Sequence, residues 1–220
     1  MIYEKLKDQN FEIVSVAQDT NGVRDAGPWI TAAKPAFTVL IDEKHEVSKL
    51  YNMVNVPTGV WIDETGHIVR PNEVAFVDDR FKTFSGLESE PYLTALKDWV
   101  AKGPASAYAM SEEKLREKLA AGSPELAMAA AEFGLASYLY KAGHGAEAVA
   151  HFKEAQRLNP KDWNYKRQAY ALTGEKEYGT TFRDEVEKIG GSKVYYTPPD
   201  MTEYKKKPEE KKKPEEKKPE

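Results

Sequence analysis

Apolar residues in the first half of the chain gather in short β-rich runs. The run from Phe11 to Ala17 predicts a buried parallel strand, and the run from Phe37 to Ile41 predicts a second strand. Residues 59–63 and 67–69 predict a hairpin, because Glu64-Thr65-Gly66 forms a turn in which glycine readily takes a positive φ. These three features predict a small sheet.

Helical spacing predicts four segments around these strands. They cover residues 1–10, 28–33, 46–51 and 91–102. Leu6 is the main apolar contact expected of the first, and Pro28 stands in the first turn of the second. Residues 19–27, which contain Asp, Thr, Asn and two glycines, predict a loop. The resulting order of helices and strands is that of an α/β domain.

Residues 111–190 follow a different pattern, rich in Ala and Glu with few β-branched residues. Segments 125–142 and 146–158 predict two helices, and 162–173 predicts the start of a third. Small residues would let antiparallel helices approach, with Phe152 filling the space between them. This spacing resembles a tetratricopeptide (TPR) repeat, with one good repeat and a partial one. Because about three repeats are usually needed for independent stability, we expect this region to pack on the first domain.

The end of the chain repeats Lys-Lys-Lys-Pro-Glu-Glu over residues 205–220 without an apolar residue. Such a segment has nothing to bury, so it is expected to be disordered. Residues 191–220 as a whole are interpreted as a linker and this charged tail. Eight Lys and five Glu leave this segment at +3. A solvated tail is favoured over a nucleic-acid or membrane arm, because interleaved Glu cancels most of the field.

The composition sets limits on size and chemistry. A chain of 220 residues, 40% hydrophobic and 31% charged, accommodates one large or two small domains. The net charge of −4 does not indicate a nucleic-acid partner. No apolar run approaches the roughly 20 residues of a membrane span, and the first residues do not form a signal peptide. The sequence leaves the compartment open.

The absence of cysteine limits catalysis and metal binding. It excludes disulfides, thiolate metal sites and thiol nucleophiles from this chain. No histidine pair has metal-ligand spacing, so all four histidines are interpreted as surface or turn residues: His45, His67, His144 and His151. Asp78 and Asp79 are interpreted as loop residues rather than paired catalytic carboxylates. We therefore predict no catalytic residue, metal ligand or cofactor in the chain.

One segment carries a resemblance to a known family. Val56-Pro57-Thr58 precedes an apolar strand, an Asp63-x2-Gly66 turn and a second short strand. Residues 1–102 resemble an N-terminally incomplete thioredoxin-like domain, closest to the TlpA/ResA-like and peroxiredoxin-related branch. The resemblance implies a cis bond before Pro57. It also implies that Val56, Pro57 and Thr58 line a groove that aligns a substrate's extended backbone beside a reactive sulfur.

The chain departs from this family in one respect. Relatives carry a Cys-x-x-Cys or selenocysteine pair, and a central strand, before the segment equivalent to residues 11–17. We hypothesise that the native product is longer and that Met1 is an internal methionine, downstream of a Trp-Ala-x-x-Sec-Gly-Cys motif whose codon reads as a stop. Coding sequence upstream of Met1 tests this idea. Without the central strand, residues 11–17 and 60–63 would lose their shared neighbour.

The sequence thus predicts a partial thioredoxin-like fold, a TPR-like helical region and a disordered charged tail. The first functional hypothesis is a relative of thiol–disulfide oxidoreductases with no redox centre in the chain as given, which is expected not to reduce insulin. The alternative is a non-catalytic module that binds a protein or peptide through the Pro57 groove and the helical region. A weaker third hypothesis is an assembly factor that uses the tail as an arm.

Overall fold

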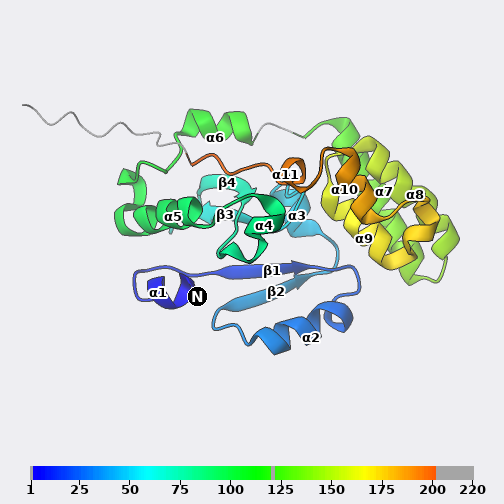
Figure 1. The fold of residues 1–220 in the computed structure, drawn as a ribbon, viewed down its shortest axis with the longest axis horizontal. Coiled ribbons are helices and arrows are strands. Elements are labelled where there is room, and N and C mark those ends of the chain that lie inside the picture. The colour runs from blue at the N-terminus through cyan, green and yellow to red at the C-terminus, as the bar shows by residue number, and fades with distance from the viewer. Residues whose placement is uncertain (1, 120–121, 202–220) are drawn as a thin grey trace, which may run out of the picture.

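The computed structural model describes residues 2–119 and 122–201, which form a mixed α/β protein (Figure 1). The strands are β1 (Val14–Gln18), β2 (Thr38–Asp42), β3 (Thr58–Ile62) and β4 (Ile68–Val74). The α-helices are α1 (Ile2–Leu6), α2 (Val23–Ala33), α3 (Glu46–Leu50), α4 (Lys82–Ser85), α5 (Glu90–Lys102), α6 (Glu112–Lys118), α7 (Pro124–Lys141), α8 (Gly145–Leu158), α9 (Trp163–Thr173), α10 (Phe182–Lys188) and α11 (Ser192–Tyr195). The tail predicted at 205–220 lies outside the described residues.

The strands form two separate pairs. β1 and β2 are parallel, with Val14 opposite Thr38, and we call them the first half-sheet. β3 and β4 form the antiparallel hairpin expected from the sequence, and we call them the second half-sheet. In the view of Figure 1, β1 lies on the side of β2 that faces the second half-sheet. Within the described residues, β1 and β3 each have one edge without a strand partner.

The start of the chain differs from the sequence prediction in two places. The first strand begins at Val14 rather than Phe11, because Phe11 packs against a core that contains Leu6. The prediction of a loop at 19–27 is wrong from Val23 onward, because α2 begins at that residue. Pro28 lies inside α2 rather than in its first turn. Gly22 at φ 64° turns the chain into this helix. Pro28 removes one helical hydrogen bond without ending the helix.

The hairpin extends further than the sequence predicts. The expected second strand at 67–69 continues to Val74 as β4, although it contains Pro71. Pro71 is compatible with a strand here because it falls at the register shift between the Gly59–Glu73 and Trp61–Arg70 pairs, where it has no partner residue on β3. The register shifts between Gly59 and Trp61, as at a β-bulge.

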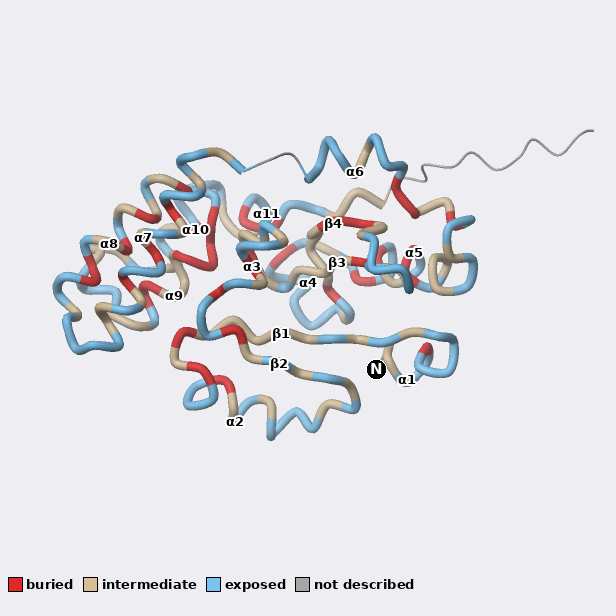
Figure 2. Tube along the Cα trace, turned by 180° about the vertical axis from the view of Figure 1, so that it is seen from behind, coloured by how far each residue is buried: buried red, intermediate tan, exposed pale blue. Residues whose placement is uncertain are grey.

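Burial is uneven between the two half-sheets (Figure 2). The second packs on α5 around a core of Leu6, Trp61, Tyr92, Ala95 and Leu96. The first contributes no buried hydrophobic residue to any described core, and Val14 and Leu40 are exposed. The first half-sheet therefore has apolar surface that its own neighbours do not cover.

The helical region forms its own core. α7 and α8 are joined by a short turn and pack closely, as the spacing of small residues predicts. Phe152 is fully buried between them, together with four alanines that have no exposed surface: Ala129, Ala136, Ala148 and Ala155. α9 adds Tyr165, whose ring stacks on Phe133 with centroids 4.2 Å apart. The third helix thus begins where the sequence predicts and completes a three-helix cluster.

The segment after α10 returns to the second half-sheet. Tyr195 and Tyr196 pack in a third core with Phe76, Trp163 and Val186. Figure 1 shows this segment crossing from the helical region toward β4. In the described part of the chain, no helix is long and apolar enough to cross a membrane.

Candidate functional site

The three residues expected to line a peptide groove are consecutive: Val56 and Pro57 end the loop before β3, and Thr58 is the first residue of β3. The Val56–Pro57 peptide bond is cis, as expected. Pro57 is exposed, whereas Val56 and Thr58 are half-buried. The Pro57 loop, defined here as residues 53–58, thus presents its proline to solvent at the start of β3.

Asn55 holds this loop in shape from the inside. Its buried side chain accepts a hydrogen bond from the Val56 N–H at 2.9 Å and donates to the Tyr195 carbonyl at 3.0 Å. The Thr58 hydroxyl donates to the Asn55 carbonyl at 2.5 Å. The Val56 N–H already donates its hydrogen bond to the Asn55 side chain, so it is not available to a substrate. No donor in the described structure reaches the Val56 carbonyl, which leaves this acceptor for a ligand.

The amino-terminal end of α9 docks on the same loop. The backbone N–H groups of Trp163 and Asn164 both donate to the Val54 carbonyl, at 2.7 and 3.3 Å. The Asn164 side chain donates to the Met53 carbonyl at 2.5 Å. The first N–H groups of a helix lack helical partners, so a loop carbonyl is a natural acceptor for them. The helical region thereby packs on the α/β region.

His45 lies where the helical region meets the α/β region, at the turn before α3 as expected, but its side chain is buried rather than on the surface. Only 3% of its surface is exposed, and Nε2 lies 3.0 Å from the Thr20 hydroxyl. Its ring contacts Phe133 of α7 edge-on, with centroids 4.9 Å apart. Of the other histidines, His67 and His144 are exposed, as expected. His151 is half-buried and pairs with Glu132 at 2.6 Å.

Burial shifts the pKa values of two titratable groups in this region in opposite directions, and in each case it favours the neutral form. Burial lowers the pKa of His45 to about 4, an effect that the Asp42 carboxylate opposes and Lys141 reinforces. Burial raises the pKa of the Asp162 carboxyl to about 7, while backbone N–H groups of Tyr165 and Asn164 lower it. Asp162 is the N-cap of α9, which accounts for its burial without a catalytic role.

The His45→Asn variant gives a prediction for pH dependence. A lowered histidine pKa means that the folded stability is fully present above pH 6.5 and is lost as the pH falls toward 4. We expect the stability advantage of the parent over the variant to shrink by about 1.5 kcal/mol between pH 6.5 and pH 5, with a slope that approaches about 1.4 kcal/mol per pH unit. Asn tolerates the positive φ of residue 45.

Urea unfolding of both proteins at several pH values measures this difference. The raised pKa of Asp162 makes stability change with pH in the opposite sense. Both proteins contain Asp162, so its effect cancels in the comparison. A difference that stays constant from pH 8 to pH 5 would show that His45 is not buried as a neutral ring.

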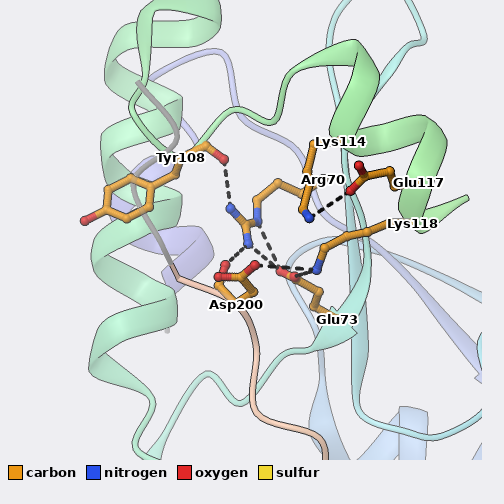
Figure 3. A network of polar contacts seen from close by, with 7 residues as sticks. All are labelled: Arg70, Glu73, Tyr108, Lys114, Glu117, Lys118 and Asp200. Atoms are coloured by element: carbon orange, nitrogen blue, oxygen red, sulfur yellow. Dashed lines mark hydrogen bonds and ion pairs between the residues drawn. The ribbon is translucent and has the colours of Figure 1, made fainter. Parts of the chain in front are cut away.

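A second polar cluster, not expected from the sequence, joins β4 and α6 (Figure 3). The Arg70 guanidinium is 1% exposed and pairs with Glu73, 8% exposed, at 2.7 Å. It also donates to the backbone carbonyls of Tyr108, at 2.8 Å, and Asp200. Lys118 of α6 pairs with Glu73 at 3.1 Å. The cluster joins segments far apart in sequence, so we interpret it as a structural clamp.

The described residues provide no group of carboxylates and histidines able to hold a metal ion. Asp78 caps a short 3₁₀ turn, and Asp79 accepts hydrogen bonds from the Ser89 N–H and hydroxyl at 2.8 Å. These aspartates therefore have local structural partners and do not form a carboxylate pair. The chemistry that the Pro57 loop offers is backbone hydrogen bonding beside an open strand edge.

Comparisons with known proteins add no further identification. No family model matches the chain, and comparison with curated proteins and with solved structures found no significant match.

Proposed function

We propose that this chain is a thioredoxin-like scaffold that aligns an extended polypeptide at the Pro57 loop and carries no redox centre of its own. The order of strands and helices, the position of the loop before β3 and the available Val56 carbonyl support the proposal. Any thiol or selenol chemistry would then require a residue that this sequence does not contain.

The main support for the proposal is that β1 and β3 each have an edge without a strand partner in the described structure. Unpaired backbone groups along a strand are a template for another strand, and proteins commonly use such edges to bind extended peptides. The open edge of β3 begins directly after Pro57, so a peptide that bonds to the Val56 carbonyl would continue along β3. The exposed side chains of Val14 and Leu40 would favour a peptide with apolar residues on one face.

A strand supplied by a longer form of the protein would satisfy the same edges. This version of the proposal predicts an in-frame coding sequence with a selenocysteine or cysteine motif before Met1. The absence of such a frame in genomic DNA would leave a separate polypeptide as the partner.

The second candidate is a binding module that uses the helical region. Exposed apolar side chains follow one side of α7, at Met128, Leu135 and Tyr138. Their spacing of seven and three residues places them on one face of a helix. A partner helix could pack on this face without any contribution from the Pro57 loop.

Two matched substitutions separate the candidates. Ile62 on β3 and Leu135 on α7 are 41% and 42% exposed, so a lysine at either position can keep its charge in solvent. The probe is the reduced and S-carboxymethylated insulin B chain, an extended polypeptide without free thiols. We expect Ile62→Lys to weaken its binding about tenfold, because a charge on an edge strand opposes strand addition. Leu135→Lys is expected to leave it unchanged.

Titration of the ¹⁵N-labelled protein by NMR measures both affinity and position. Peptide-induced shifts at residues 56–62 support the proposed function. Weakening by Leu135→Lys alone would select the helical candidate, and binding that neither substitution changes would contradict both.

A further inference from the structure

The two half-sheets are held together at the ends of β1 rather than along its length. Near its amino-terminal end, Phe11 packs in the α5 core and Asn10 donates to the Glu64 carboxylate at 2.8 Å. Past its carboxyl-terminal end, the chain meets α9. Between these points no strand pairing joins β1 to β3 in the described structure. Their separation must therefore be set by the elements at the two ends.

At the second end, Gln18 of β1 donates directly to the Met53 sulfur at 3.8 Å, and one face of α9 supplies further contacts. Asn164, Arg167 and Gln168 lie three and four residues apart, which places them on the same side of the helix. Asn164 bonds to the Met53 carbonyl of the Pro57 loop. Arg167 donates to the Asn55 side chain at 3.4 Å and to the Tyr195 hydroxyl.

Gln168 makes the matching contact to the first half-sheet. Its Oε1 accepts from the Thr20 N–H at 3.0 Å, and its Nε2 lies 3.5 Å from the Gln18 carbonyl. In a parallel sheet, a residue makes the same two hydrogen bonds to its neighbouring strand. It donates to one carbonyl and accepts from the N–H two residues further along that strand. The side-chain amide of Gln168 therefore takes the place of a strand residue at the end of β1.

We propose that α9 is a clasp that positions the Pro57 loop relative to β1, with Gln168 and Asn164 as its two attachment points. The clasp deepens the proposed function, on which its relevance to peptide binding rests. Because α9 belongs to the helical core through Tyr165 and Ala169, the helical region sets the separation of the half-sheets. A partner that moves α9 would then change the access of a peptide to the loop.

Spin labels test the clasp without any peptide. The full chain has no cysteine, so labels attached at Thr38→Cys on β2 and Lys97→Cys on α5 report only the distance between the two halves. Both positions are exposed. We expect one narrow distance distribution in the otherwise unchanged protein. The double substitution Asn164→Ala and Gln168→Ala is expected to broaden that distribution and lengthen its mean.

Three further variants show whether the effect belongs to the clasp. Gln168→Glu keeps the acceptor for the Thr20 N–H but places a carboxylate oxygen against the Gln18 carbonyl, so it is also expected to broaden the distribution. Gln156→Ala on α8 removes an amide of the same type and is expected to change nothing. Should the double variant fail to fold, Gln168→Ala alone replaces it. We expect amide exchange at Thr20 to be about fivefold faster in that variant, as for the loss of one hydrogen bond.

The results separate the clasp from the proposed function. An unchanged distance in a folded double variant would overturn the clasp, and so would equal broadening in Gln156→Ala. Failure of the insulin B chain to bind the parent protein would count against the proposed function and leave the distance measurement valid.

Discussion

Replacing Arg70 with Ala is expected to lower the free energy of unfolding by about 3–5 kcal/mol, as for the loss of one member of a buried ion pair. The substitution leaves the Glu73 carboxylate buried with Lys118 as its remaining cationic partner. It also removes the donor for the Tyr108 and Asp200 carbonyls. Denaturant unfolding followed by circular dichroism measures the loss.

Two controls test whether the buried charge causes this loss. The double substitution Arg70→Met and Glu73→Leu removes both charges and is expected to cost much less than Arg70→Ala. Lys114→Ala breaks an exposed pair with Glu117 in the same cluster and is expected to have no measurable effect (Figure 3). Equal losses in Arg70→Ala and the double variant would show that the clamp acts through packing alone.

Replacing Phe152 with Ala is expected to lower the free energy of unfolding by about 3–5 kcal/mol. The ring is fully buried, and alanines of α7 and α8 form much of its surroundings. Small side chains cannot move far enough to fill the space, so a cavity would remain. The same unfolding experiment measures the change.

Phe152→Leu is the control for this prediction. It retains most of the side-chain volume and should lose clearly less stability than Phe152→Ala. A loss below about 1 kcal/mol for the alanine variant would contradict the packing of α7 and α8 around this ring.

Local patterns predicted much of the fold. The alternation of small residues with Phe152 gave the α7–α8 pair, and Gly66 marked the hairpin turn. Both features depend on residues close together in the sequence. Helix α2 was missed at its start because Pro28 suggested a first turn, whereas the positive φ at Gly22 actually turns the chain into the helix.

Contacts between distant segments could not be predicted from the sequence. His45 is buried because Phe133, almost ninety residues later, packs against its ring. Arg70 is buried because the chain returns at Tyr108 and Asp200. Neither residue stands in a local pattern that marks burial, since both belong to polar turn or hairpin segments.

The role of the candidate site stays a prediction. The resemblance pointed to Val56, Pro57 and Thr58, and of its implications the structure bears out the cis bond before Pro57. It did not reveal that Asn55 occupies the Val56 N–H, or that α9 holds the loop. Those contacts depend on how the helical region docks, which single-segment patterns do not encode.

Residue-resolved amide hydrogen exchange of β1 and β3 tests the central claim, that each strand has an open edge able to take a polypeptide. We expect alternate amides along both strands to exchange rapidly, because only those directed at β2 or β4 are in a ladder. Addition of the carboxymethylated insulin B chain should then slow the exposed set along β3. Uniform protection of every amide in the free protein would show that the two half-sheets are joined and would contradict the account.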